Sequence, residues 1–164
     1  MQGLPSLIVM VVRLLLSYKK QGEKEANKSG KPLANLLIVD DDSDIAHVLK
    51  EGLQKNQFLV SAFTNPEAAL KNFQSNSEDY CLVLSDIRMP GMSGIRLARR
   101  VKEINPNVKV VLMTSFEIRD NEFSKVFPST QVDGFVQKPV GIKNLTNKIL
   151  DTIGETKRRL YEQQ

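Results

Sequence analysis

The chain has 164 residues, 41% of them hydrophobic, and carries a formal net charge of +4. This length supports one hydrophobic core and is too short for two domains of ordinary size. The single cysteine, Cys81, excludes an internal disulfide framework and a metal site made of several cysteines, and it is compatible with a reducing compartment.

The positive charge comes from the N-terminal part of the chain. Residues 1–35 hold six basic and two acidic side chains, whereas residues 36–154 hold fourteen basic and fifteen acidic ones. The last ten residues hold three basic and two acidic side chains. Because the body of the chain is nearly neutral, its charge gives no support to direct DNA binding.

Residues 1–34 combine an apolar segment with a basic linker. The segment Leu4–Leu16 is interrupted by Arg13, and as a helix its thirteen residues would extend about 20 Å, less than the ~30 Å hydrocarbon core of a bilayer. It lacks the preceding basic residues and the following cleavage site of a signal peptide, so we expect a cytoplasmic protein. We interpret residues 1–34 as a disordered or wrongly assigned extension. The alternative is a weak peripheral membrane contact, in which the linker lysines face anionic lipid.

From Leu36 onward, short apolar runs alternate with helix-period patterns, which is typical of β-α units around a parallel sheet. The apolar runs predict five strands, at Leu36–Val39, Phe58–Ala62, Tyr80–Ser85, Val108–Met113 and Gly134–Gln137. The helical patterns predict a helix after each strand: through Ile45, Val48, Leu49 and Leu53; from Pro66 to Phe73; from Ile95 to Ile104; weakly near Asp120–Phe127; and from Ile142 to Ile153. These units predict a doubly wound α/β sheet, whose ligands bind beyond the carboxyl ends of the strands.

Polar side chains follow four of the predicted strands. They are Asp40–Asp42 after the first strand, Asp86 after the third, Thr114 and Ser115 after the fourth, and Lys138 after the fifth. At one edge of a sheet, crowded carboxylates repel one another, and a divalent cation such as Mg²⁺ removes that repulsion. Lys138 and Thr114 offer a cation and a donor for phosphoryl oxygens, and an aspartate can act as the nucleophile. Each residue alone also fits a helix cap, a turn or the surface, but their joint placement favours a phosphoryl-transfer site.

The same segments resemble the motifs of response-regulator receiver domains. Leu36–Asp44 resembles the acidic-pair motif, Leu82–Gly94 the phosphoacceptor motif with its Met-Pro-Gly turn, Val110–Ser115 the strand that ends in the switch hydroxyl, and Gly134–Pro139 the segment with the switch aromatic and Lys-Pro. The resemblance covers residues 35–153 and implies a flavodoxin-like, five-stranded parallel sheet of order 2-1-3-4-5 with five surrounding helices. It puts the receiver domain at residues 35–154 and the end of a helix with a tail at residues 155–164.

The resemblance also implies a chemical role for Asp86. This residue would accept a phosphoryl group from the phosphohistidine of a sensor histidine kinase or phosphotransfer protein. Asp41, Asp86 and the backbone carbonyl of Arg88 would bind Mg²⁺, and Asp40 would hold a metal-bound water. The chain would not be an enzyme in the usual sense, because the only group that it phosphorylates is its own.

A switch is implied in addition. Lys138 and Thr114 would hold the phosphoryl oxygens, and Phe135 would swing inward as Thr114 moves toward the phosphate. The change would alter a face that binds a downstream protein target. A cis peptide bond before Pro139 would aim Lys138 at the site.

Some residues depart from the commonest pattern of the family. Phe135 stands where tyrosine is frequent, and Phe116 lies two residues past the switch hydroxyl. Arg88 lies two residues past the phosphoacceptor. Because Phe116 and Arg88 would crowd an attacking water, we expect a long-lived phosphorylated state.

Two alternative functions come from other classes. Asp40 and Asp42 form the Asp-x-Asp spacing of haloacid-dehalogenase-like phosphohydrolases, in which Asp40 would be the nucleophile and Asp86 would have no role. A receiver-like adaptor that works without phosphorylation is the other alternative, and the complete acidic set disfavours it.

Overall fold

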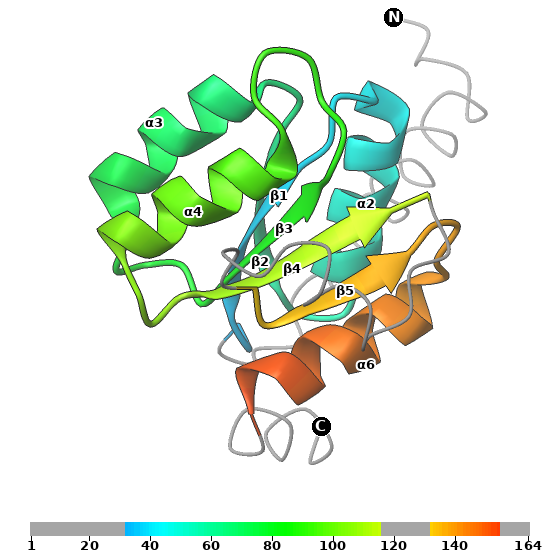
Figure 1. The fold of residues 1–164 in the computed structure, drawn as a ribbon. Coiled ribbons are helices and arrows are strands. Elements are labelled where there is room, and N and C mark those ends of the chain that lie inside the picture. Colours follow the sequence, from blue (N-terminus) through cyan, green and yellow to red (C-terminus); the bar gives the residue numbers. More distant parts are fainter. Residues whose placement is uncertain (1–31, 116–131, 155–164) are drawn as a thin grey trace, which may run out of the picture. The chain divides into compact units, whose positions relative to one another are not determined.

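Five parallel strands form one sheet with the order β2-β1-β3-β4-β5 (Figure 1). The structure, a computed structural model, describes residues 32–115 and 132–154. The strands are β1 (Asn35–Val39), β2 (Leu59–Phe63), β3 (Leu82–Asp86), β4 (Lys109–Thr114) and β5 (Gly134–Gln137). The predicted order and parallel direction are confirmed, with strand ends that shift by at most two residues from the predicted ones.

Four helices surround the sheet in the described residues, and not the five that the resemblance implied. They are α2 (Ser43–Lys55), α3 (Pro66–Asn76), α4 (Gly94–Ile104) and α6 (Ile142–Ile153). The remaining predicted helix, near Asp120–Phe127, lies outside the described residues. Its apolar pattern was the weakest of the five, so the sequence alone gave this helix the least support.

Short polar side chains cap the N-termini of three of the helices. Asp42 caps α2 by accepting hydrogen bonds from the backbone N–H groups of Asp44 and Ile45, at 2.9 and 3.2 Å. Asn65 accepts one from the N–H of Ala68 at the start of α3, and Ser93 accepts one from the N–H of Arg96 at the start of α4. These caps satisfy N–H groups that have no partner within the helix. They therefore fix where each loop beyond the sheet ends.

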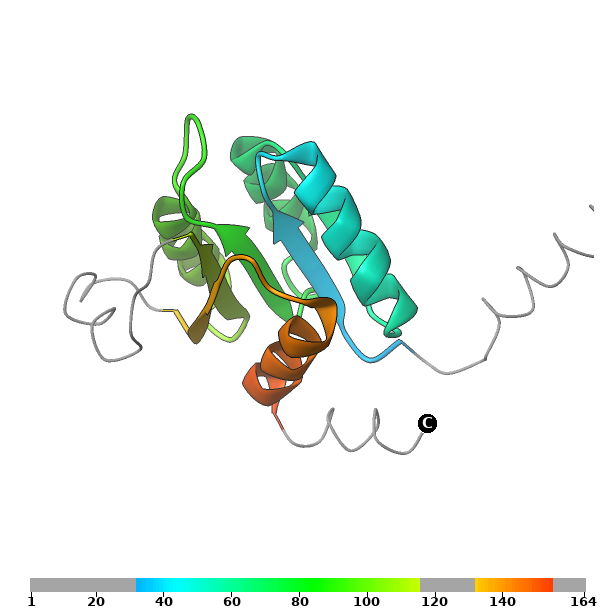
Figure 2. The same cartoon turned by 90° about the vertical axis from the view of Figure 1, so that its right-hand side faces the viewer.

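Side chains from alternate positions of the strands form two apolar layers, one on each face of the sheet. One layer joins Ile38 and Leu84 to residues of α2 and α6, such as Leu49 and Leu145. The other joins strand residues to α3 and α4, and it includes Leu37, Val83, Phe73, Leu97 and Leu112. Figure 2 shows the helices on both sides of the sheet. Because both faces are covered, the three central strands β1, β3 and β4 are almost wholly buried, whereas the edge strands β2 and β5 are only partly buried.

The surface of α2 differs from its predicted pattern at one position. The helical pattern runs through the apolar residues Ile45, Val48, Leu49 and Leu53, but the relative exposure of Val48 is 59%. The buried residues of α2 are Ala46, Leu49 and Leu53. The helical period identifies which residues share a face, but the neighbouring element decides how much of that face is covered, and here it leaves Val48 in solvent.

Candidate functional site

The carboxyl ends of β1, β3 and β5 bring three of the predicted residues into contact. Lys138, which follows β5, places its Nζ atom 2.6 Å from Oδ2 of Asp40 and 2.8 Å from Oδ1 of Asp86. Asp40 follows β1 directly, and Asp86 is the last residue of β3. The strands are in register near this edge, because Val39 pairs with Ser85 and Asp86 pairs with Met113. The predicted meeting of these side chains at one edge is therefore observed.

Each of the two carboxylates uses its second oxygen to accept a backbone hydrogen bond. Oδ1 of Asp40 accepts from the N–H of Asp42 at 3.0 Å, and Oδ2 of Asp86 accepts from the N–H of Arg88 at 2.9 Å. The residue Asp40 is 1% exposed and Asp86 is 7% exposed. Charges that are buried to this extent need such partners, because water no longer solvates them.

Lys138 supplies the positive charge that these carboxylates require. Burial lowers the pKa of Lys138, but its hydrogen bonds to Asp40 and Asp86, together with their charges, outweigh that effect and hold the pKa above the ordinary value. Its backbone N–H donates to the carbonyl oxygen of Thr114 at 2.7 Å, which ties the end of β5 to the end of β4. The peptide bond between Lys138 and Pro139 is cis, in agreement with the implied geometry.

Thr114 closes the site from the side of β4. It is 2% exposed and lies at the end of its strand. A cavity of about 20 Å³ lies between the ends of β3 and β4, lined by Asp86, Ile87, Arg88, Thr114 and Ser115. This cavity joins the predicted phosphoacceptor to the predicted switch hydroxyl. Phe135 lies on β5 opposite Leu112 and packs, partly buried, against the apolar layer of α3 and α4.

The loop after β3 is held by contacts that were not anticipated from the sequence. The buried hydroxyl of Ser85 donates to the backbone oxygen of Asp86 at 2.9 Å. The N–H of Gly94 donates to the carbonyl of Ile87 at 2.8 Å, and a Cβ atom at Gly94 would lie only 2.0 Å from the backbone oxygen of Asp86. The only signal for Ser85 in the sequence is a hydroxyl inside an otherwise aliphatic run.

The donor set suits a hard divalent cation. Asp41 is exposed beside the buried Asp40, and Asp86 adds a second carboxylate at the same edge. Within the described ranges, no group of three or more His, Cys, Asp or Glu side chains is arranged as a complete metal site. The predicted set needs only two carboxylates and one backbone carbonyl, and Mg²⁺ takes few protein ligands because it keeps several waters. The residues present therefore fit Mg²⁺.

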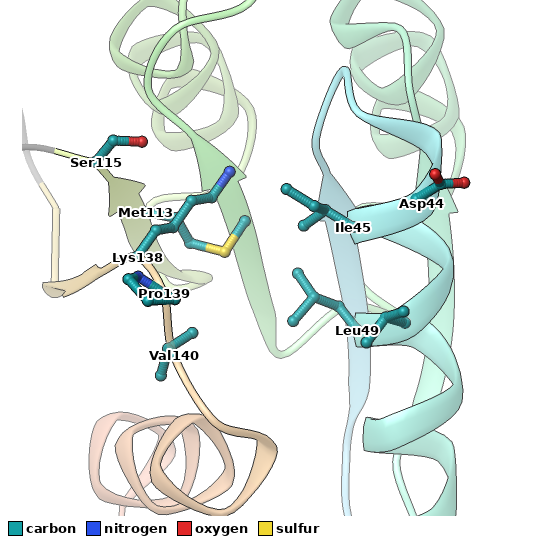
Figure 3. Close-up of a pocket in the computed structure, with 9 residues that line it drawn as sticks. Asp44, Ile45, Leu49, Met113, Ser115, Lys138, Pro139 and Val140 are labelled. Carbon is teal, nitrogen blue, oxygen red and sulfur yellow. The ribbon is translucent and has the colours of Figure 1, made fainter.

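An open apolar groove lies beside the acidic site (Figure 3). Its volume is about 580 Å³, and in Figure 3 α2 lies on one side of it and the segment Lys138–Val140 on the other. It is lined by Asp44, Ile45, Val48, Leu49, Met113, Ser115, Lys138, Pro139 and Val140. Lys138 thus belongs to both the acidic site and the groove.

The sequence model of the family described as the response regulator receiver domain matches residues 36–150. The chain belongs to this family. Among curated relatives, the response regulator receiver protein CpdR of Brucella abortus is 34% identical over 118 residues, which are 71% of this chain and 94% of CpdR. The transcriptional regulator NtrC of Proteus hauseri is 40% identical over 81 residues, which are 49% of this chain and 17% of NtrC. The receiver domain thus spans nearly all of the first protein and a small part of the second.

Solved structures of receiver domains have the same fold. A response regulator receiver domain protein from Clostridium thermocellum is 25% identical, with a TM-score of 0.67, and the match covers 77% of this chain and 98% of that one. The response regulator TrrA of Thermotoga maritima, solved in complex with Mg²⁺ and BeF, is 31% identical with a TM-score of 0.64, over 73% of this chain and 98% of TrrA.

Receiver domains are signalling domains of two-component systems, and phosphorylation and Mg²⁺ binding are typical of the family. The match gives no support to the haloacid-dehalogenase-like alternative. None of the helices within residues 32–115 and 132–154 has the length and hydrophobicity that a bilayer crossing needs. The predicted membrane contact concerns residues 1–34, of which the structure describes only 32–34. Phe116, which was predicted to crowd the site, lies outside the described residues.

Proposed function

We propose that this receiver domain is a phosphorylation-dependent switch in which Asp86 accepts a phosphoryl group from a sensor histidine kinase or phosphotransfer protein. The observation that carries the proposal is the position of Lys138, whose ammonium contacts Asp86 and Asp40 at 2.8 and 2.6 Å. A carboxylate nucleophile beside a fixed cation is the arrangement that phosphoryl transfer requires, because the cation stabilises the charge on the transferred oxygens.

The acceptor chemistry follows from the side chains at the strand ends. A carboxylate oxygen of Asp86 forms a bond to phosphorus as the bond from phosphorus to the histidine nitrogen of the donor breaks, which leaves an acyl phosphate on Asp86 and a free histidine on the partner. Lys138 and the hydroxyl of Thr114 bind the phosphoryl oxygens. Asp41, Asp86 and the backbone carbonyl of Arg88 would hold Mg²⁺, with Asp40 acting through a water. When bound, the ion supplies positive charge that offsets the repulsion between the carboxylates and the incoming phosphoryl group.

The signal leaves the site through Thr114 and Phe135. Thr114 lies on β4, and Phe135 lies on the neighbouring edge strand β5. Because Phe135 is only partly buried, its side chain has room to change its packing. Movement of Thr114 toward the phosphoryl group would favour the inward position of Phe135 and change the face that a downstream protein binds. The readout is a protein contact in the cytoplasm, without direct DNA binding by residues 35–154.

The phosphoryl donor would reach Asp86 over the apolar groove. Lys138 and Ser115 line the groove and also border Asp86, so a partner that brings phosphorus to Asp86 must cover at least part of the groove. Burial of the exposed Val48 in that contact would add hydrophobic free energy. We therefore assign the groove to the kinase or phosphotransfer protein.

The direct test is modification by acetyl phosphate and Mg²⁺, followed by intact mass spectrometry. The wild type should gain one phosphoryl group, and Asp86→Asn should gain none. Asp79→Asn, at an exposed aspartate that precedes the amino end of β3 and therefore lies away from the carboxyl-end site, is the matched control and should behave as the wild type. Modification that persists in Asp86→Asn would contradict the proposal, and a wild type that is never modified would favour the adaptor that works without phosphorylation.

A further inference from the structure

Ser85 is a buried hydroxyl within β3, a strand that is buried at all five of its positions. It is 1% exposed, and the three residues before it in β3 are aliphatic and fully buried. Its Oγ donates to the backbone oxygen of the next residue, Asp86, at 2.9 Å. A hydroxyl in such a place loses the water that would solvate it, so its presence calls for an explanation beyond filling space.

Gly94, the first residue of α4, packs against the same carbonyl. A Cβ atom at Gly94 would lie 2.0 Å from the backbone oxygen of Asp86 and 3.0 Å from Oγ of Ser85. The helix therefore approaches so closely that large side chains are excluded at both positions. Alanine at position 85 would satisfy this limit of size, but it would lack the donor.

Together these contacts fix two successive carbonyl groups. Ser85 holds the carbonyl of Asp86, and the N–H of Gly94 holds the carbonyl of Ile87 at 2.8 Å. The N–H of Ile87 donates to Met113 on β4 at 3.0 Å. The next residue along is Arg88, whose N–H binds the Asp86 carboxylate and whose carbonyl is the proposed backbone ligand of Mg²⁺.

We propose that Ser85 is a positioning residue for the Mg²⁺ site: by holding the carbonyl of Asp86 against Gly94, it sets the direction of the Asp86 carboxylate and of the Arg88 carbonyl. The proposal rests on the proposed function, because it assumes that these groups bind the ion. A hydroxyl that only satisfied a buried carbonyl would support folding without affecting the ion, and the two roles are separable by experiment.

The test compares Mg²⁺ affinity in the wild type and Ser85→Ala, by NMR titration of the backbone amides with MgCl₂ alone. Loss of one net hydrogen bond that aligns the ligands should raise the Mg²⁺ dissociation constant about three- to tenfold. In the absence of the ion, the amide hydrogen of Gly94 should also exchange with solvent faster in Ser85→Ala than in the wild type. In the acetyl phosphate reaction, the Mg²⁺ concentration for half-maximal rate should rise by the same factor, while the rate at saturating Mg²⁺ stays within about twofold of the wild type.

Thr146→Val is the matched control. Thr146 is another buried hydroxyl, 2% exposed on α6, and its Oγ1 has no hydrogen-bond partner within the part of the chain that the structure describes. The Mg²⁺ dissociation constant of Thr146→Val should equal that of the wild type. If Ser85→Ala does not fold, Ser85→Cys keeps a weak donor of similar size and should give a smaller increase in the same direction.

The outcomes separate the two claims. A wild type that binds Mg²⁺ and is phosphorylated on Asp86, with an unchanged dissociation constant in Ser85→Ala, overturns the role of Ser85 alone. An equal loss of affinity in Thr146→Val would also overturn it, since any buried hydroxyl would then have the same effect. A wild type that neither binds Mg²⁺ nor accepts a phosphoryl group overturns both claims.

Discussion

The ammonium of Lys138 lies 2.8 Å from a carboxylate oxygen of Asp86, although the strands that lead to these residues are separated by β4. The contact depends on the sheet order and on the register between β3, β4 and β5, and not on any local sequence pattern. A phosphoryl group on Asp86 would therefore meet a cation that is already in place, with little reorganisation.

Replacement of Lys138 by methionine should destabilise the fold. The change leaves the buried Asp40 and Asp86 carboxylates without their shared cation, so we expect the free energy of unfolding at pH 7 to fall by about 1–3 kcal/mol. Urea denaturation followed by circular dichroism measures the change. The double variant Lys138→Met, Asp40→Asn lacks one of the two uncompensated charges, so it should recover part of the lost free energy of unfolding. A double variant less stable than Lys138→Met would contradict this explanation.

A second prediction concerns the pH dependence of Asp133, which precedes β5. Burial raises the pKa of Asp133, but hydrogen bonds from Lys102, the Val110 backbone and Lys109 outweigh burial and hold the pKa below its ordinary value of 3.8. A depressed pKa means that the unfolded state binds the proton more tightly than the folded state does. The contribution to stability is therefore complete well above pH 3.8 and is lost as the pH falls through the lower pKa of the folded state.

Asp133→Asn should thus lose about 0.5–1.5 kcal/mol of unfolding free energy at pH 7. The difference from the wild type should shrink as the pH falls below 3.8. Urea denaturation at a series of pH values provides the measurement. A difference that stays constant down to pH 2 would show that the charge of Asp133 is not the cause.

Gly94 packs so closely against Asp86 that a Cβ atom does not fit without movement of the backbone. In Gly94→Ala the new Cβ would lie 2.0 Å from the backbone oxygen of Asp86, so the loop or the helix must move. We expect a loss of about 1–3 kcal/mol, together with weaker Mg²⁺ binding. Gly141→Ala is the control, because a Cβ there meets nothing within 4 Å, and its cost at the start of α6 should be about 0.5 kcal/mol. Equal costs at both positions would contradict the close contact.

The fourth prediction concerns the groove as the contact surface for the phosphohistidine donor. Val48→Arg should slow phosphoryl transfer from a phosphohistidine donor about tenfold or more, because a charge would replace an apolar contact. Its reaction with acetyl phosphate should be unchanged, since a small donor has no need of the groove. Leu59→Arg is the matched control, because Leu59 is 53% exposed, close to the 59% of Val48, but lies on β2 and does not line the groove. A slower reaction with both donors would point to damage at Asp86 instead.

The sequence predicted most of the fold because aliphatic runs and helical periods report directly on burial. It also predicted that Lys138, Asp40 and Asp86 lie at one edge of the sheet, since the carboxyl ends of parallel strands meet there. The direct ion pairs of Lys138 with the two carboxylates are seen only in the structure. The ends of strands were less certain, because the limit of β3 at Asp86 depends on pairing with β4 and not on hydrophobicity.

Other features could not be read from the sequence, for physical reasons. The exposure of Val48 depends on where α6 and the segment before it leave α2 uncovered, and a helical period contains no such information. The role of Ser85 depends on a backbone approach by Gly94, which only three-dimensional packing creates. The identity of each Mg²⁺ ligand came from the family resemblance, and it stays a prediction.

The central claim is tested most directly by locating the acyl phosphate itself. After reaction with a phosphohistidine donor or acetyl phosphate, borohydride reduces an aspartyl phosphate to homoserine, and peptide mass spectrometry then identifies the modified residue. We predict homoserine at position 86 and at no other aspartate. Homoserine at position 40 or 41, or its absence from a protein that has been phosphorylated, would contradict the assignment of Asp86 as the acceptor.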